Sequence, residues 1–216
     1  RAPGNTCLSA SRAGAHGTVS EPINDSKGCG GVMRVAPVGL VTAWTVDEAF
    51  NMGCAVAAMT HGHPSGYLSA GALAFIVRTV VGGSELREAT ESAIEKLEAI
   101  SGGQETASAL SEALSLAEDT PRDPTDAVAK LGEGWVGEEA LAIGLYSALK
   151  ADSFSNAVIV AANHDGDSDS TASIAGQIYG AIHGYDALPS DWITALDVGS
   201  MLDDLSGLFL QTVESE

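Results

Sequence analysis

The sequence is poor in cysteine, in aromatic residues (5%) and in positive charge. Its three cysteines, Cys7, Cys29 and Cys54, lie more than twenty residues apart along the 216-residue chain. This spacing excludes a paired-cysteine zinc or redox motif, and the odd number argues against a disulfide framework. A reducing compartment, the cytoplasm, is the simplest expectation.

Long apolar segments are also missing. The best candidate, residues 71–81, is interrupted by Arg78 and is shorter than the roughly 20 residues that a membrane-spanning helix needs. No basic segment followed by an apolar one opens the chain, so we expect no signal peptide and no membrane association. The first residue is Arg1 rather than Met, so we expect a processed or truncated N-terminus.

Acidic residues dominate the charge, with 29 Asp and Glu against 10 Lys and Arg and a net charge of −19. Such a surface favours solubility and repels duplex nucleic acid and anionic membranes, so neither is an expected partner. The balance differs along the chain. Residues 1–83 carry five basic and four acidic residues, whereas residues 84–216 carry five and twenty-five, so the first stretch is the better place for a bound anion.

Helical periodicity dominates the 45% of residues that are apolar, and no alternating strand pattern is clear. The expected helices cover residues 45–59, 69–81, 84–100, 105–117, 126–130, 138–150, 153–163, 170–183 and 191–213, the last with a break near Gly199. Residues 120–124 are typical of a turn. We therefore predict one all-α domain over residues 1–216, a compact orthogonal multi-helix bundle whose many glycines let helices approach closely.

The richest set of polar side chains is residues 163–171, Asn-His-Asp-Gly-Asp-Ser-Asp-Ser-Thr, just before a predicted helix. Asp or Ser at such a place can cap the free N–H groups of the first helical turn. Carboxylate and hydroxyl oxygens this close together are also the ligands that Mg²⁺ or Ca²⁺ prefers. Both interpretations remain open from spacing alone. In the helix that follows, Gly176, Gly180 and Gly184 predict a smooth face for a neighbouring helix.

Two further segments have weaker chemical signals. Residues 24–31, Asn-Asp-Ser-Lys-Gly-Cys-Gly-Gly, expose backbone N–H groups that suit a phosphate, although the pattern by itself favours an ordinary loop before a helix. His61 and His63 could ligate a metal only with a third ligand, and His61 could donate a hydrogen bond to a phosphate or ribose. Alternatively, they form a capped turn, with Pro64 starting the next helix.

Five stretches taken together resemble the ADP-ribosylglycohydrolase family. They are Arg-Ala-Pro-Gly-Asn-Thr at 1–6, Ser-Lys-Gly-Cys-Gly-Gly-Val-Met-Arg-Val-Ala-Pro at 26–37, Thr-His-Gly-His-Pro at 60–64, Gly-Glu-Gly-Trp-Val with Glu-Ala-Leu at 132–136 and 139–141, and residues 163–171 with the glycines that follow. The resemblance implies an all-helical fold with two Mg²⁺ (or Mn²⁺) ions. It implies a hydrolase that cleaves the glycosidic bond between ADP-ribose and a protein side chain or a small molecule.

The resemblance also implies roles for individual residues. The implied metal ligands are Asp167, Asp169 and Ser170, and the two aspartates would take part in catalysis through the metal. The implied substrate-binding residues are Ser26, Lys27, Gly28, Cys29, Gly30 and Gly31 around the diphosphate and ribose, His61 beside them, and Gly134 and Trp135, with Gly4, on the adenosine side. No residue is assigned as the general base.

One departure from the family pattern is large. The family's N-terminal section, with a Gly-Asp segment and a Thr-Asp-Asp triplet that hold the remaining metal ligands, has no counterpart in residues 1–24. The chain then corresponds to the C-terminal two-thirds of the family domain. It is expected to be a fragment, to share its site with a second chain, or to be an inactive relative. A non-catalytic ADP-ribose- or metal-binding protein and a structural helical protein are the alternatives, and the acceptor and oligomeric state stay open.

Overall fold

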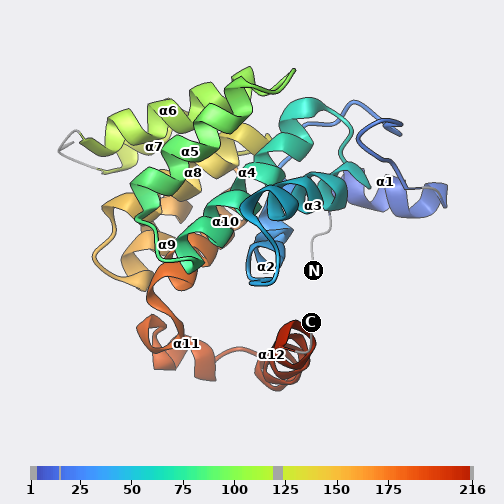
Figure 1. Cartoon of the computed structure of the whole chain (residues 1–216). Coiled ribbons are helices and arrows are strands. Elements are labelled where there is room, and N and C mark those ends of the chain that lie inside the picture. The colour runs from blue at the N-terminus through green and yellow to red at the C-terminus, as the bar shows by residue number, and fades with distance from the viewer. Residues whose placement is uncertain (1–3, 15, 119–123, 215–216) are drawn as a thin grey trace.

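The computed structural model describes residues 4–14, 16–118 and 124–214, and over these residues it contains helices and no strand (Figure 1). The all-α prediction is therefore confirmed. The turn expected at residues 120–124 lies almost entirely outside the described residues. The nearest approach to a sheet is one isolated antiparallel bridge between Gly28 and Val136.

The elements follow one another with short connections. They are α1 (Asn5–Ala13), η1 (Val32–Arg34), α2 (Ala36–Gly39), α3 (Val46–Ala58), α4 (Pro64–Val81), α5 (Leu86–Glu98), α6 (Gln104–Glu118), α7 (Pro124–Leu131), α8 (Gly137–Lys150), α9 (Phe154–Ala162), α10 (Ser168–His183), η2 (Tyr185–Ala187), α11 (Ser190–Thr194) and α12 (Gly199–Glu214).

Glycines allow α3 and α4 to pack closely against each other. A Cβ atom on Gly53 would lie 2.8 Å from the Cβ of Ala74, and one on Gly71 would overlap the sulfur of Cys54. The backbones therefore approach to a distance that a larger residue would prevent, as the glycine content predicts. Thr45 and Glu48 form the reciprocal capping box that fixes the start of α3.

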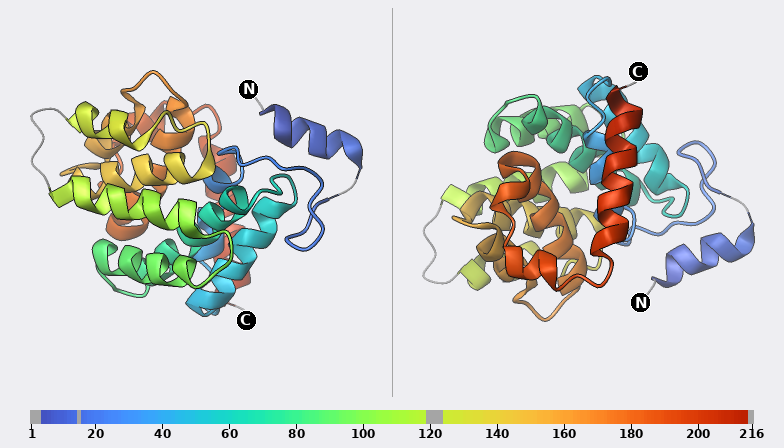
Figure 2. Two further views of the ribbon diagram at one scale, coloured as in Figure 1. Left: turned by 90° about the horizontal axis from the view of Figure 1, so that it is seen from above. Right: turned by 90° about the horizontal axis from the view of Figure 1, so that it is seen from below.

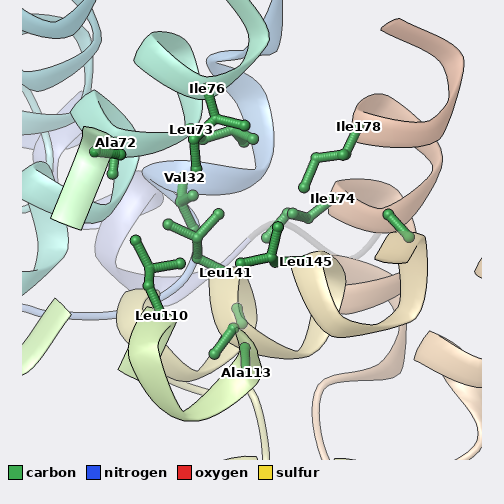
Figure 3. Close-up of a cluster of buried hydrophobic side chains, with 14 of the residues drawn as sticks. Val32, Ala72, Leu73, Ile76, Leu110, Ala113, Leu141, Leu145, Ile174 and Ile178 are labelled. Atoms are coloured by element: carbon green, nitrogen blue, oxygen red, sulfur yellow. The ribbon is translucent and has the colours of Figure 1, made fainter. Parts of the chain in front are cut away.

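Helix α4 runs through the centre of the bundle (Figure 1). Among the described residues it is the one helix long and apolar enough to cross a membrane, yet 72% of that 18-residue window is buried inside the protein. Its side chains meet those of η1, α6, α8 and α10 in one cluster (Figure 3). The labelled members include Val32, Leu73, Ile76, Leu110, Leu141, Leu145, Ile174 and Ile178. This shared core holds the ends of α8 and α10 in fixed positions.

Three sequence expectations about helices need correction. Helix α4 begins at Pro64, five residues before the expected 69, which confirms the capped-turn interpretation of the histidines, because His63 caps the helix by accepting a hydrogen bond from the Ser65 N–H. The predicted smooth face of α10 holds only at Gly176, which lies against Phe154 and Val158. A Cβ on Gly180 would meet nothing within 4 Å, and residue 184 lies beyond the end of the helix.

The first and last helices, α1 and α12, lie at the outside of the bundle (Figure 2). Helix α1 was not predicted because its face is polar and it buries a single residue, Ala10. The final expected helix is indeed broken, into α11 and α12, with residues 195–198 between them. Helix α12 exposes several leucines and faces a hollow lined also by Pro37, Leu40 and Thr42.

Candidate functional site

The glycine-rich loop and the acidic segment meet in space. The Cys29 thiol donates a hydrogen bond to Oδ2 of Asp167 at 2.6 Å, across 138 positions of sequence. The same sulfur lies 3.4 Å from Oγ of Ser170. Gln177 of α10 adds a second link, because its Nε2 donates to the Met33 carbonyl at 2.7 Å. The glycine-rich loop and the acidic segment therefore form one site.

A third segment, residues 133–137, lies between these two and joins them through its backbone. On one side, the Cys29 N–H donates to the Trp135 carbonyl at 3.1 Å. On the other side, the Asp167 N–H donates to the Glu133 carbonyl at 2.8 Å. Gly134 has a φ of +77°, and a Cβ there would come within 2.6 Å of Cγ2 of Thr171, so glycine is required at this position.

The turn at residues 133–134 has its own anchor. Oε2 of Glu139 accepts hydrogen bonds from the N–H groups of Glu133 and Gly134, both at 3.1 Å. The Trp135 ring is 56% exposed, and its Nε1 donates to Glu133. Gly134 and the Trp135 backbone thus belong to the site, whereas the indole ring lies on the surface beside it.

The two predicted metal-binding carboxylates are coupled to each other. Burial raises the pKa of Asp167, but hydrogen bonds from Asp169, Cys29 and Ser170 outweigh it and the net pKa is lowered. The pKa of Asp169 is raised, chiefly by its hydrogen bond with Asp167. The two carboxylates therefore lie close enough to repel each other when both are charged, a repulsion that a bound cation would relieve. Asp167 occupies the N-cap position of α10 without making a side-chain cap, so the capping explanation does not account for it.

The donor set suits a hard divalent cation only in part. Asp167 and Asp169 offer charged oxygens, and the buried Ser170 adds a hydroxyl, which matches the preference of Mg²⁺ for oxygen ligands. No cluster of three or more His, Cys, Asp or Glu side chains suited to a metal occurs in the part of the chain that the structure describes. These residues can thus supply one side of a coordination shell. Asp165, the neighbouring aspartate, is exposed.

Asn24 holds the glycine-rich loop against the histidine turn. Its Nδ2 donates to the Thr60 carbonyl at 2.8 Å, and its Oδ1 accepts from the N–H groups of Ser26 and Gly62. Ser26 then accepts from the Gly28 N–H at 3.3 Å and bonds Thr6 of α1. This local network brings His61 under the loop, where the imidazole is 1% exposed.

Lys27 is the exception among the predicted ligand-binding residues. Its Nζ forms an ion pair with Oε1 of Glu138 at 2.6 Å and with Oε2 of Glu105 at 3.2 Å. The hydrogen bond to Glu138 is the largest cause of the raised pKa of Lys27, and Glu105 also accepts a short hydrogen bond from Ser65. The ammonium is therefore neutralised within the protein. Its carbonyl accepts from the Gly137 N–H at 2.8 Å, so Lys27 fastens the loop to the start of α8.

This attachment leads to a stability prediction for Lys27→Met. Glu138 is buried and its Oε2 has no hydrogen-bond partner, so removal of the ammonium leaves a desolvated carboxylate. We expect a loss of about 2 kcal/mol in the free energy of unfolding, less than for a fully buried pair because Lys27 is partly solvated. Urea denaturation measures this loss. The matched control, Arg87→Met, breaks the exposed pair with Glu118 and should cost less than about 1 kcal/mol. Equal losses in the two variants would refute this role for Lys27.

A groove of about 910 Å³ opens beside the acidic segment. Arg34, Asp169 and Gln177 lie along its polar edge, and Phe154, Tyr185 and Trp192 contribute aromatic walls. The lining contains no residue of the glycine-rich loop 24–31. Asp169 therefore stands at the boundary between the groove and the region where the loops meet.

Several residues of the site were not predicted as functional. They are Asn24, Arg34, Thr60, Glu105, Glu138 and Glu139. The Asn-x-Ser spacing at positions 24–26 is typical of a side-chain-to-backbone turn and could have identified the first of them. The partners of Lys27 lie 78 and 111 positions away, and no local pattern indicates such pairs.

Comparison with known proteins adds independent findings. The sequence model of the ADP-ribosylglycohydrolase family matches residues 1–215. The chain is 30% identical over 194 residues to an uncharacterized protein of Archaeoglobus fulgidus, a match that covers 89% of this chain and 60% of that protein. It is 26% identical over 197 residues to the ADP-ribosyl-(dinitrogen reductase) glycohydrolase of Rhodospirillum rubrum, covering 90% and 60%.

Two more distant matches are also to proteins named for the hydrolysis of ADP-ribosyl groups. The ADP-ribosylarginine hydrolase Tri1 of Serratia proteamaculans is 24% identical over 176 residues, covering 80% of this chain and 43% of that protein. A solved structure described as an ADP-ribosylglycohydrolase-related protein complex superposes with a TM-score of 0.75 at 21% identity, covering 97% of this chain and 69% of the other. The chain spans about three-fifths or less of the length of these curated relatives, and the structural match shows the fold.

Proposed function

Because the chain belongs to the ADP-ribosylglycohydrolase family, we propose that it forms part of a hydrolase that cleaves the glycosidic bond between ADP-ribose and its acceptor. One observation carries the proposal, namely the 2.6 Å contact between Cys29 of the glycine-rich loop and Asp167 of the acidic segment. It joins a segment with backbone N–H groups suited to a diphosphate to a segment with carboxylates suited to a cation. A nucleotide sugar needs both kinds of group within one site.

We further propose that the reaction depends on Mg²⁺ or Mn²⁺ held by Asp167, Asp169 and Ser170. The raised pKa of Asp169, caused first by its hydrogen bond to Asp167, supports this, because it reflects two adjacent carboxylates whose repulsion a cation would relieve. A bound divalent ion acts as a Lewis acid and activates water. Since these three residues offer part of a shell, water, substrate or residues outside this sequence complete it.

An ADP-ribosylated arginine side chain on a protein is the substrate that we propose. Two of the relatives carry names that point this way, an ADP-ribosylarginine hydrolase and a glycohydrolase of ADP-ribosylated dinitrogen reductase. The excess of acidic groups in residues 84–216 supports a positively charged acceptor, because it attracts a guanidinium group and repels an anionic one.

A second function is favoured by the incomplete metal shell. The described residues contain no cluster of three or more acidic, His or Cys side chains suited to a metal. A site of this kind could hold ADP-ribose through the glycine-rich loop without hydrolysing its esters or glycosides. We propose this binding role as the alternative for the 216-residue chain taken by itself.

One experiment separates the two functions. The 216-residue chain is incubated with a peptide that carries ADP-ribosylated arginine, in excess Mg²⁺ and in parallel with EDTA. Release of free ADP-ribose in Mg²⁺ and its loss in EDTA are expected for the hydrolase. Binding of ADP-ribose by calorimetry without release supports the alternative. If the chain neither releases ADP-ribose from the peptide nor binds ADP-ribose, that result contradicts both proposed functions.

A further inference from the structure

Three side chains, that of Arg34 and those of the neighbouring residues Thr60 and His61, form a hydrogen-bonded series beneath the glycine-rich loop. Nη2 of Arg34, at the end of η1, lies 2.7 Å from Oγ1 of Thr60 and 3.0 Å from the Val56 carbonyl. The same Thr60 oxygen lies 2.7 Å from Nδ1 of His61. The series therefore runs from an exposed guanidinium to a buried imidazole.

The donors and acceptors of this series can be counted. A guanidinium only donates, so Oγ1 of Thr60 accepts from Arg34 and keeps its own proton to give. The Ala57 carbonyl, 3.4 Å away, already accepts from the N–H groups of Thr60 at 3.0 Å and of His61 at 2.9 Å. Both lone pairs of that carbonyl are thus in use. The 2.7 Å contact with Nδ1 of His61 is much shorter than the 3.4 Å contact with that carbonyl, so it favours the Thr60 hydroxyl as the donor to an unprotonated Nδ1.

The other ring nitrogen faces the glycine-rich loop. Nε2 of His61 lies 3.5 Å and 3.3 Å from the positions that Cβ atoms would take at Gly28 and Gly30. The His61 residue as a whole is 1% exposed, so the ring lies beneath the loop rather than on the surface. Because Gly28 and Gly30 have no side chains of their own, the backbone of the loop passes close to this nitrogen. This arrangement leaves Nε2 available to a ligand on the loop.

We propose that Arg34 and Thr60 are positioning residues that hold His61 as the Nε2–H tautomer, so that it donates a hydrogen bond to an anionic oxygen of a ligand on the glycine-rich loop. That this oxygen is a phosphate oxygen of ADP-ribose rests on the proposed function. The tautomer itself does not. The opposite tautomer would present a lone pair to the oxygen and repel it.

The charge state of His61 makes the tautomer decisive. Burial, and then the positive charge of Arg34, lower the pKa of His61 to about 4. The ring is therefore neutral at pH 7 and can donate from only one of its two nitrogens. Which nitrogen donates is then set by the hydrogen bond at Nδ1, that is, by Thr60.

The first test needs no ligand. Nitrogen-15 NMR of the labelled 216-residue chain at pH 7 identifies which ring nitrogen of His61 is protonated. The chemical shift of each ring nitrogen, and its coupling to the protons on the ring carbons, distinguish the two tautomers. We expect protonation at Nε2 in the wild type and a mixture of tautomers in Thr60→Val. Thr60→Ser should restore the wild-type signal because it keeps the hydroxyl. A wild-type ring protonated at Nδ1, or an unchanged tautomer in Thr60→Val, would overturn the proposal.

The contribution of Arg34 is tested in the same way. Arg34→Met removes the donor that orients the Thr60 hydroxyl, and we expect a partial loss of the Nε2–H preference, smaller than in Thr60→Val. Arg34 also lines the groove beside Asp169, so a change in ligand affinity alone would be ambiguous. A wild-type tautomer in Arg34→Met would remove Arg34 from the proposal.

Calorimetric titration with ADP-ribose tests the consequence for binding. We expect Thr60→Val to weaken binding about tenfold, the effect of one hydrogen bond to a charged group, and Thr60→Ser to restore it. The matched control is Thr79→Val, which removes a half-buried hydroxyl that bonds the Phe75 carbonyl away from the site, and it should bind like the wild type. Equal affinity in Thr60→Val and the wild type would refute the role of the tautomer in binding. Absence of ADP-ribose binding in the wild type would contradict the proposed function instead, and the NMR result would still decide the tautomer.

Discussion

Gly166→Ala is expected to lower the free energy of unfolding by about 3 kcal/mol, because a methyl group has no space there. A Cβ on Gly166 would overlap the Glu133 carbonyl oxygen and lie 2.6 Å from its carbon. That oxygen also accepts the hydrogen bond from the Asp167 N–H. Relief of the clash must therefore move the acidic segment away from residues 133–137, and we expect ligand binding to be lost together with stability. Urea denaturation and ADP-ribose titration measure the two effects.

Gly180→Ala is the matched control for this variant. Gly180 lies within α10, and a Cβ there would meet nothing within 4 Å. Alanine has the higher helix propensity, so we expect a gain of about 0.5–1 kcal/mol in the free energy of unfolding. If Gly166→Ala were as stable as Gly180→Ala, residues 133–137 and the acidic segment would not be in the contact described.

Asp167→Asn is expected to have the second large effect, on function rather than on folding. The amide keeps the shape of the side chain but removes the charge that a divalent ion needs. If the complete site is a hydrolase, we expect turnover to fall by at least about 100-fold, which corresponds to about 2.7 kcal/mol in transition-state stabilisation. The free energy of unfolding should change by no more than about 1 kcal/mol, since the hydrogen bond with Cys29 can still form. Release of ADP-ribose from the arginine-modified peptide measures turnover.

The neighbouring Asp165 provides the control. It lies two positions away on the same segment, its side chain is exposed, and no ion pair is found for it among the described residues. Asp165→Asn should therefore retain wild-type turnover and stability. Equal turnover in Asp167→Asn and Asp165→Asn would remove Asp167 from the metal-binding role.

Much of the helical fold could be predicted from local patterns. The capping box at Thr45 and Glu48 marks the start of α3, and the apolar periodicity of α5 and α8 gives their extent to within a few residues. Helix α1 was missed because it buries only Ala10 and has no apolar stripe to reveal it. The start of α4 at Pro64 depends on a cap by His63. From the sequence alone, His63 could be either a metal ligand or part of a capped turn.

The site could be predicted in part. The motifs identified which segments matter, and the structure brings Gly28, Cys29, His61, Gly134 and Asp167 into one region. The direction of a side chain is set by long-range contacts that spacing does not encode. The stretch in which Lys27 lies resembles a ligand-binding segment and predicts that Lys27 binds the ligand. In the structure, however, the Lys27 ammonium is paired with Glu138.

Glycines of the site illustrate the same distinction between local and long-range causes. Gly134 could be suspected from its turn context, and its positive φ explains it locally. Gly62 and Gly166 have no positive φ, and each is required because a carbonyl from another segment passes close by, that of Asn24 for Gly62 and that of Glu133 for Gly166. Such close approaches become visible only once the segments are folded together.

The central claim is that the glycine-rich loop and the acidic segment form one ligand site with a divalent ion. Calorimetric titration of the 216-residue chain with ADP-ribose, in Mg²⁺ and again in EDTA, tests it most directly. We expect Mg²⁺ to tighten ADP-ribose binding at least about tenfold, because the cation relieves the repulsion between Asp167 and Asp169 and attracts the ligand's oxygens. Identical affinity in Mg²⁺ and in EDTA would contradict the claim.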